Sequence, residues 1–164
     1  MPNTSHSVLR EGAIAGVIGA TAVAIWFFIV DMIGGRPLFT PATLGAGLLS
    51  VFGQSPEPVA VNVIAYTIFH YAVFILVGML AVVLVHAGER RPSVLAGSLI
   101  LFVAMELGFY GLVAMLEETV LGNLAWYQIL AGNLLAAVLM GTYVWRAHPT
   151  MGQGLVRALE GTSD

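Results

Sequence analysis

The sequence predicts an all-α integral membrane protein, folded as a four-transmembrane-helix bundle with a short outer interfacial helix in the first loop. Hydrophobic residues make up 59% of the 164 residues and charged residues only 9%, whereas a soluble domain is about one quarter charged. Four long runs are almost free of charge, as helices that cross lipid must be. Together, the composition and the four runs indicate a chain that lies within a bilayer.

The composition also excludes several other classes of protein. So high an apolar content is not that of a disordered chain, and the absence of cysteine excludes a disulfide-stapled domain. The formal net charge of −3 argues against a nucleic-acid-binding surface, which is strongly basic. We therefore expect the lipid bilayer as a partner and no nucleic acid.

The four apolar runs are long enough for helices that cross the membrane. A hydrocarbon core of roughly 30 Å needs about 20 residues at about 1.5 Å each. The runs are too long and too evenly apolar for the strands of a membrane barrel. We predict a single membrane domain, 1–164, with transmembrane helices at about 10–33, 58–87, 92–117 and 121–146 and a cytoplasmic tail at 147–164.

The first loop contains a shorter apolar segment. Thr40 and Pro41 have the pattern of a helix start, with an N-cap hydroxyl followed by proline at the first helical position. The segment that follows is too short to cross the bilayer. We predict an interfacial helix at about 41–52 that lies on the outer face as a lid over the bundle. A gate or a docking surface is the alternative interpretation.

The charges predict the orientation of the chain. All six basic residues are arginines. Five of them precede the first span, join the second span to the third, or lie at the end of the fourth span and beyond it. In a four-span chain these segments lie on the same side of the membrane as both termini. The positive-inside rule places both termini in the cytoplasm, and we expect a bacterial inner membrane. The outer face is acidic, which we interpret as surface charge with an Asp31–Arg36 ion pair or, alternatively, as a site for a cation or a basic partner. This outer acidic cluster consists of Asp31, Glu57, Glu117 and Glu118.

Polar residues occur near the middle of each span. Thr21, His70, Glu106 and Asn133 each lie within about one helical turn of the centre of their own run. Polar side chains at this depth cost free energy when they face lipid, so they turn inward and find partners. We expect these four residues to form one polar layer inside the bundle.

The helical spacing extends this layer toward the outer face. Tyr66 precedes His70 by four positions, and Tyr110 follows Glu106 by four, so each pair shares a helix face. We predict that His70 and Glu106 interact, either as a buried pair that fixes helix register or as a proton relay or ligand site. The predicted intramembrane polar site consists of His70, Glu106, Tyr66, Tyr110, Asn62 and Asn133.

The sequence predicts no cofactor and no metal site. Haem b bound through His70 is an alternative, but it needs a second axial ligand. His86, sixteen residues further along the same predicted helix, is roughly 24 Å away and is not that ligand. The Glu-x-x-His pairs of a di-metal carboxylate site are absent. His6, His86 and His148 are interpreted as solvated residues on the cytoplasmic side.

Catalytic motifs are also absent, including a cysteine nucleophile, G-x-S-x-G, H-E-x-x-H and a phosphate-binding loop. Ridges of small residues, which allow helices to approach closely, occur on the first span at Gly12, Gly16 and Ala20 and on the last span at Ala137 and Gly141. A softer face on the last span contains Gly132, Ala136 and Met140.

Two functional hypotheses follow from these features. The first is an accessory or scaffold subunit of a larger membrane complex, respiratory or photosynthetic. The second is an autonomous bundle with a proton-relay or small-ligand site, quinone-like or haem-like, that opens to the outer face. The expected partners are other membrane subunits or further copies of the chain.

Overall fold

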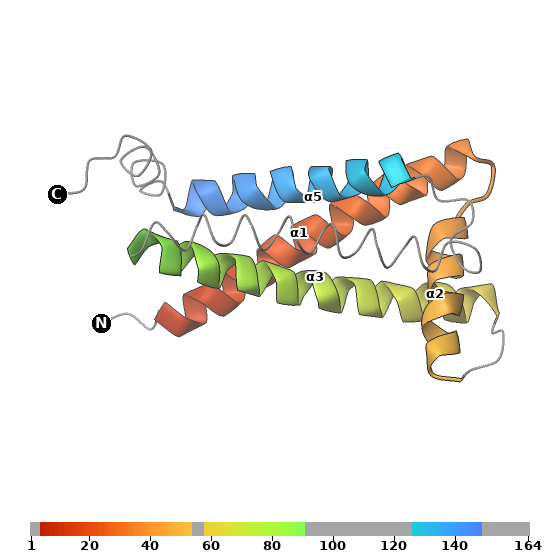
Figure 1. The fold of residues 1–164 in the computed structure, drawn as a ribbon, viewed down its shortest axis with the longest axis horizontal. Coiled ribbons are helices and arrows are strands. Elements are labelled where there is room, and N and C mark those ends of the chain that lie inside the picture. Colours follow the sequence, from red (N-terminus) through yellow and green to blue (C-terminus); the bar gives the residue numbers. More distant parts are fainter. Residues whose placement is uncertain (1–3, 54–57, 91–125, 149–164) are drawn as a thin grey trace.

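The computed structural model describes residues 4–53, 58–90 and 126–148, and its regular secondary structure in these ranges is helical throughout. Its helices are α1 (Thr4–Ile33), α2 (Phe39–Val51), α3 (Val59–Arg90) and α5 (Trp126–Ala147) (Figure 1). The all-α prediction is therefore confirmed for the described residues. The predicted span at 92–117 and the tail beyond 148 lie outside them.

Three of the helices are long and apolar enough to cross a membrane. The qualifying stretches are Val8–Ile33 in α1, Val59–Ala87 in α3 and Tyr127–Ala147 in α5. The 13-residue α2 is too short to span a bilayer. Many large apolar side chains on the three long helices are exposed, among them Ile25, Leu76 and Leu134, and this is compatible with contact to lipid.

The helix α1 lies between α3 and α5 and contacts both (Figure 1). The first turns of α1 lie at the same end of the bundle as the last turns of α3 and α5, so α3 and α5 both run antiparallel to α1. The short helix α2 runs across the opposite end and packs mainly against α3. The bundle thus has two distinct ends, one covered by α2 and one where three long helices meet.

Glycine residues bring the backbones of α1 and α3 into direct contact. A Cβ atom built on Gly16 would overlap the backbone of Phe74 and Ile75, and one built on Gly78 would overlap the backbone of Gly12 and Gly16. Only residues without a side chain allow so close an approach. The small-residue ridge predicted on the first span is therefore used inside the bundle.

The buried apolar core lies toward the end where the three long helices meet. Ala15 of α1, Val82 of α3, and Met140 and Val144 of α5 form one cluster of buried side chains. Each long helix contributes to this cluster, so the relative positions of their ends are fixed by side-chain packing.

The start of α2 differs from the prediction made for it. The helix begins at Phe39, after Leu38 in a left-handed conformation with φ 65° that makes no side-chain cap. Thr40 lies inside the first turn, where its amide donates to Asp31 Oδ2 at 2.8 Å and its hydroxyl donates to Asp31 Oδ1 at 2.7 Å. The carboxylate at the end of α1 thus satisfies a backbone amide that the first turn of a helix leaves open.

The expected Asp31–Arg36 ion pair is therefore replaced by other contacts. Asp31 is only 5% exposed and its carboxylate accepts hydrogen bonds from Thr40, whereas the guanidinium of Arg36 lies over the ring of Phe39 at 3.9 Å from its centroid. Burial next to an unsatisfied backbone amide explains the difference, because the carboxylate is the nearest strong acceptor.

Candidate functional site

The first candidate site is the polar layer where α1 and α3 cross. The buried ring of His70 donates a hydrogen bond from Nε2 to the carbonyl oxygen of Ala20 at 3.1 Å. Because a carbonyl only accepts, Nε2 carries the proton, and in the neutral ring Nδ1 carries a lone pair. The hydroxyl of Tyr66 lies 3.5 Å from this Nδ1, and the two rings stack with centroids 5.4 Å apart.

Two further polar contacts join neighbouring helices. The hydroxyls of Thr21 on α1 and Tyr71 on α3 share a hydrogen bond of 3.0 Å. The indole Nε1 of Trp26 donates to the backbone carbonyl of Gln128 on α5 at 2.8 Å. Together with the His70–Ala20 bond, these contacts connect α1 to both of its neighbours.

The structure brings together part of the predicted polar site. His70 and Tyr66 are in contact, and Asn62 is buried on the same helix at the level of α2, where a Cβ atom on Gly45 would overlap its carbonyl. Asn133 is half-buried on α5. The remaining predicted residues, Glu106 and Tyr110, lie outside the described residues, as do Glu57, Glu117 and Glu118. The His70–Glu106 interaction therefore stays a prediction.

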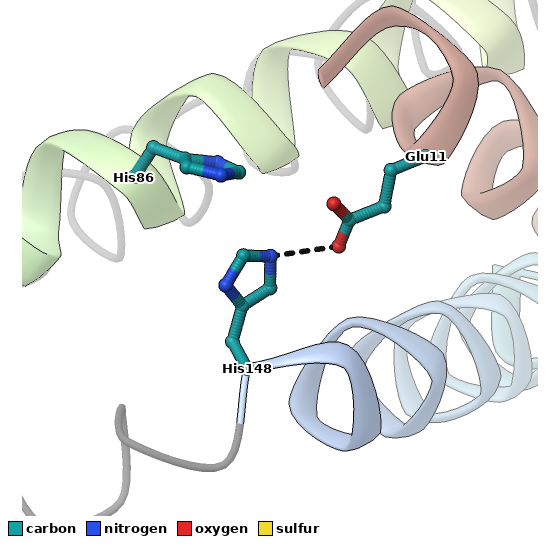
Figure 2. Close-up of side chains that lie close together, drawn as sticks. All are labelled: Glu11, His86 and His148. Carbon is teal, nitrogen blue, oxygen red and sulfur yellow. Dashed lines mark hydrogen bonds and ion pairs between the residues drawn. The ribbon is translucent and has the colours of Figure 1, made fainter. Parts of the chain in front are cut away.

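A second cluster lies where the three long helices meet. Glu11 of α1, His86 of α3 and His148, the residue after α5, point toward one another (Figure 2). One ligand atom from each lies within 4.8 Å of the others. His148 Nε2 donates to Glu11 Oε1 at 2.8 Å, and both side chains are only 14% exposed. These residue types, two imidazoles and a carboxylate, are common metal ligands.

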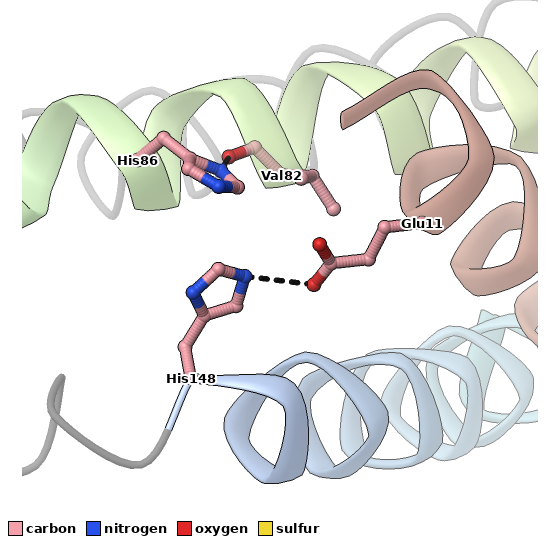
Figure 3. Close-up of polar contacts among 4 residues, drawn as sticks. All are labelled: Glu11, Val82, His86 and His148. Atoms are coloured by element: carbon pink, nitrogen blue, oxygen red, sulfur yellow. Dashed lines mark hydrogen bonds and ion pairs between the residues drawn. The ribbon is translucent and has the colours of Figure 1, made fainter. Parts of the chain in front are cut away.

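The ring of His86 is oriented by its own helix. Its Nδ1 donates to the carbonyl of Val82 at 2.9 Å (Figure 3), so Nε2 carries the lone pair in the neutral ring. The rings of His86 and His148 meet edge to face, with centroids 4.6 Å apart. A histidine that binds a metal through one ring nitrogen usually donates a hydrogen bond from the other, often to a backbone carbonyl.

The backbone at His148 is held by hydrogen bonds to the last turn of α5. The amide of His148 donates to the carbonyl of Val144 at 3.0 Å, so His148 continues the geometry of α5, and the next residue in the sequence is a proline, which ends helices. Val82 and Val144, the residues whose carbonyls hold His86 and His148, both belong to the buried core. His86 and His148 therefore each follow a residue of the buried core by about one helical turn.

From the sequence, His86 and His148 are expected on one side of the membrane as solvated residues, and no pattern singles out Glu11. The predicted topology does indicate that the three residues could meet. In a four-span protein, the start of the first span and the ends of the second and fourth spans lie on the same side of the membrane. What sequence could not supply is the rotation of each helix, which turns these side chains inward.

Comparison with models of known protein families, with curated proteins and with solved structures found no match.

Proposed function

We propose that the protein is an accessory or scaffold subunit of a larger membrane complex, respiratory or photosynthetic, in a bacterial inner membrane. Its termini lie in the cytoplasm, and α2 lies as an interfacial helix on the outer face. The proposal rests mainly on one observation, a face of α5 that carries small residues and is left open by the rest of the described bundle.

The open face of α5 contains Ala137 and Gly141. Both are exposed, and among the described residues nothing lies within 4 Å of a Cβ atom built on Gly141. By contrast, Gly12 and Gly16 pack against α3, and Gly132 packs against Trp26. Small residues let membrane helices associate closely, so this face suits the approach of a further helix, which in this proposal belongs to another subunit.

The polar contacts inside the bundle support a structural role. Thr21, His70 and Trp26 each form a hydrogen bond to a neighbouring helix. Interhelical hydrogen bonds in membranes fix helix register, and each stabilises the bundle by about 0.6 kcal/mol on average. A bundle held in one arrangement in this way is suited to positioning partner subunits.

We further infer that residues 92–117 form a fourth span. The last turn of α3 and the first turn of α5 lie at opposite ends of the bundle, so the chain that joins them has to cross its length. The run at 92–117 contains two charged residues, Glu106 near its middle and Glu117 at its end, and is long enough to cross as a helix.

Purification from the native membrane tests the proposed function. The chain is tagged at its chromosomal locus with a histidine-free affinity tag and extracted in a mild detergent. We expect another membrane protein to co-purify in a fixed ratio. The variant Gly141→Leu should lose that partner, whereas Leu134→Ala, on an exposed position of the same helix, should retain it. A homogeneous particle made only of this chain would contradict the proposal.

A second candidate function is a proton-relay or small-ligand site at His70. The contact between the Tyr66 hydroxyl and His70 Nδ1 favours it, because a proton can pass between a hydroxyl and an imidazole that lie next to each other. Haem b bound through Nε2 would have to replace the hydrogen bond to Ala20. Retention of a quinone-like ligand by the purified homo-oligomer, or a Soret absorption band, would favour this function over a scaffold.

A further inference from the structure

We propose that Glu11, His86 and His148 form a binding site for one divalent transition-metal ion at the end of the bundle where α1, α3 and α5 meet. The metal would be ligated by His86 Nε2, His148 Nε2 and a carboxylate oxygen of Glu11, with water completing its coordination. This site is separate from the predicted polar layer at His70 and does not depend on the proposed function.

The ligand set selects the class of metal. Two imidazole nitrogens and one carboxylate oxygen suit Zn²⁺, Co²⁺ and related first-row ions, whereas Mg²⁺ and Ca²⁺ prefer sites made of oxygen alone. The same set of two histidines and one carboxylate occurs in zinc sites that keep a position open and in non-haem iron sites. A structural zinc site with four protein ligands would need one more side chain.

The geometry requires little rearrangement to accept an ion. Metal–ligand bonds of about 2.0–2.2 Å place neighbouring ligand atoms roughly 3 Å apart, and His148 Nε2 already lies 2.8 Å from Glu11 Oε1. One ligand atom of each of the three residues lies within 4.8 Å of the other two. To bind an ion, His148 Nε2 gives up the proton that it shares with Glu11, either to Nδ1 of the same ring or to solvent, and the positive ion then takes the place of that proton beside the carboxylate.

His86 is the residue that argues most strongly for a metal rather than for an ion pair alone. An ion pair needs only Glu11 and His148, whereas His86 is held by the Val82 carbonyl so that its Nε2 lone pair is available for coordination (Figure 3). The half-buried position of all three side chains shields the site while leaving access for water and ions.

Titration of the purified full-length protein with Co²⁺ tests the site. The protein is isolated in detergent with a histidine-free tag, treated with a chelator and dialysed. We expect one Co²⁺ per chain, with visible absorption bands of a nitrogen- and oxygen-ligated ion that disappear when Zn²⁺ is added. Zn²⁺ should also raise the thermal unfolding temperature, since a ligand that binds only the folded state stabilises it.

Three variants distinguish this site from binding elsewhere. Glu11→Gln keeps the shape of the side chain and a hydrogen bond to His148, and His86→Asn removes the imidazole; each should weaken Co²⁺ binding by at least about tenfold. Thr142→Ala, at an exposed position of α5 whose hydroxyl bonds only its own helix, should leave binding unchanged. Size-exclusion profiles and helical circular dichroism identify folded variants.

Failure of the wild-type protein to bind Co²⁺ or Zn²⁺ would overturn the proposal without reference to any variant. Binding that survives both Glu11→Gln and His86→Asn, or that is lost equally in folded Thr142→Ala, would overturn it as well. None of these results would bear on whether the chain co-purifies with a partner subunit.

Discussion

His148 donates a hydrogen bond of 2.8 Å to the carboxylate of Glu11, a residue 137 positions earlier in the chain, and so joins the end of α5 to the start of α1. A contact of this kind between ends of the sequence is made only when the helices have packed. A substitution of Glu11 therefore tests whether α1 packs against the end of α5, even when no metal is bound.

We predict that Glu11→Ala lowers the free energy of unfolding in detergent by about 1–3 kcal/mol, the range for loss of a charge-assisted hydrogen bond between largely buried groups. Arg10→Ala, at the neighbouring exposed position, is the control and should change it by less than about 0.5 kcal/mol. Denaturation followed by circular dichroism measures both. Equal effects of the two substitutions would contradict the assigned contact.

Because the backbones of α1 and α3 are in contact, the cost of replacing a glycine by a larger residue should depend strongly on its position. Gly16→Val should destabilise the protein by about 3 kcal/mol or prevent folding, because its Cβ would overlap the backbone of Phe74 and Ile75. Gly141→Val, where none of the described residues lies within 4 Å of the added Cβ, should be tolerated. Thermal unfolding in the same detergent compares them, and a stable Gly16→Val variant would refute the observed packing.

The buried carboxylate of Asp31 predicts that α2 depends on it. Asp31→Ala leaves the amide and hydroxyl of Thr40 without their acceptor, at a cost of about 1–3 kcal/mol, and should loosen α2 from the bundle. The labelling rate of a cysteine introduced at Leu44 should rise in this variant. Ser50→Ala, which removes only an exposed bond within α2, should leave the rate unchanged. Similar rates in all three proteins would exclude the anchoring role.

The predicted His70–Glu106 pair has its own test. If the pair is structural, Glu106→Gln should keep the stability of the native protein, because an amide of the same shape still forms hydrogen bonds. Glu106→Leu should lower the free energy of unfolding by about 1–3 kcal/mol by leaving a polar partner unsatisfied. Equal stability of the leucine and glutamine variants would exclude a direct interaction.

The helical architecture was predictable because the thickness of the bilayer sets the number of consecutive apolar residues that a spanning helix needs. The start of α2 was predicted less well, since Thr40 followed by Pro41 is a good local cap signal but the acceptor that matters, Asp31, comes from the end of α1. A local pattern contains no information about a side chain nine residues away that tertiary packing brings to the helix end.

The candidate sites show the same limit. The stripe that contains Tyr66 and His70 follows from helical spacing, and the two residues are in contact. His70 uses its Nε2 on the backbone carbonyl of Ala20, a partner that no residue pattern reveals because every residue has a carbonyl. The convergence of Glu11, His86 and His148 depends on the rotation of three helices about their axes, which packing against Val82 and Val144 determines.

The central claim is that the ends of α1, α3 and α5 meet, with Glu11, His86 and His148 facing one another. The chain has no native cysteine, so cysteine pairs can be introduced without background and treated in native membranes with a short bifunctional thiol reagent. A protease site inserted after Gly53 separates the fragments unless they are cross-linked. Cysteines at positions 11 and 148, and at 11 and 86, should hold the fragments together, whereas a pair at 11 and 130, at the far end of α5, should not. Separation of the fragments in both test pairs, or equal cross-linking of the control pair, would contradict the claim.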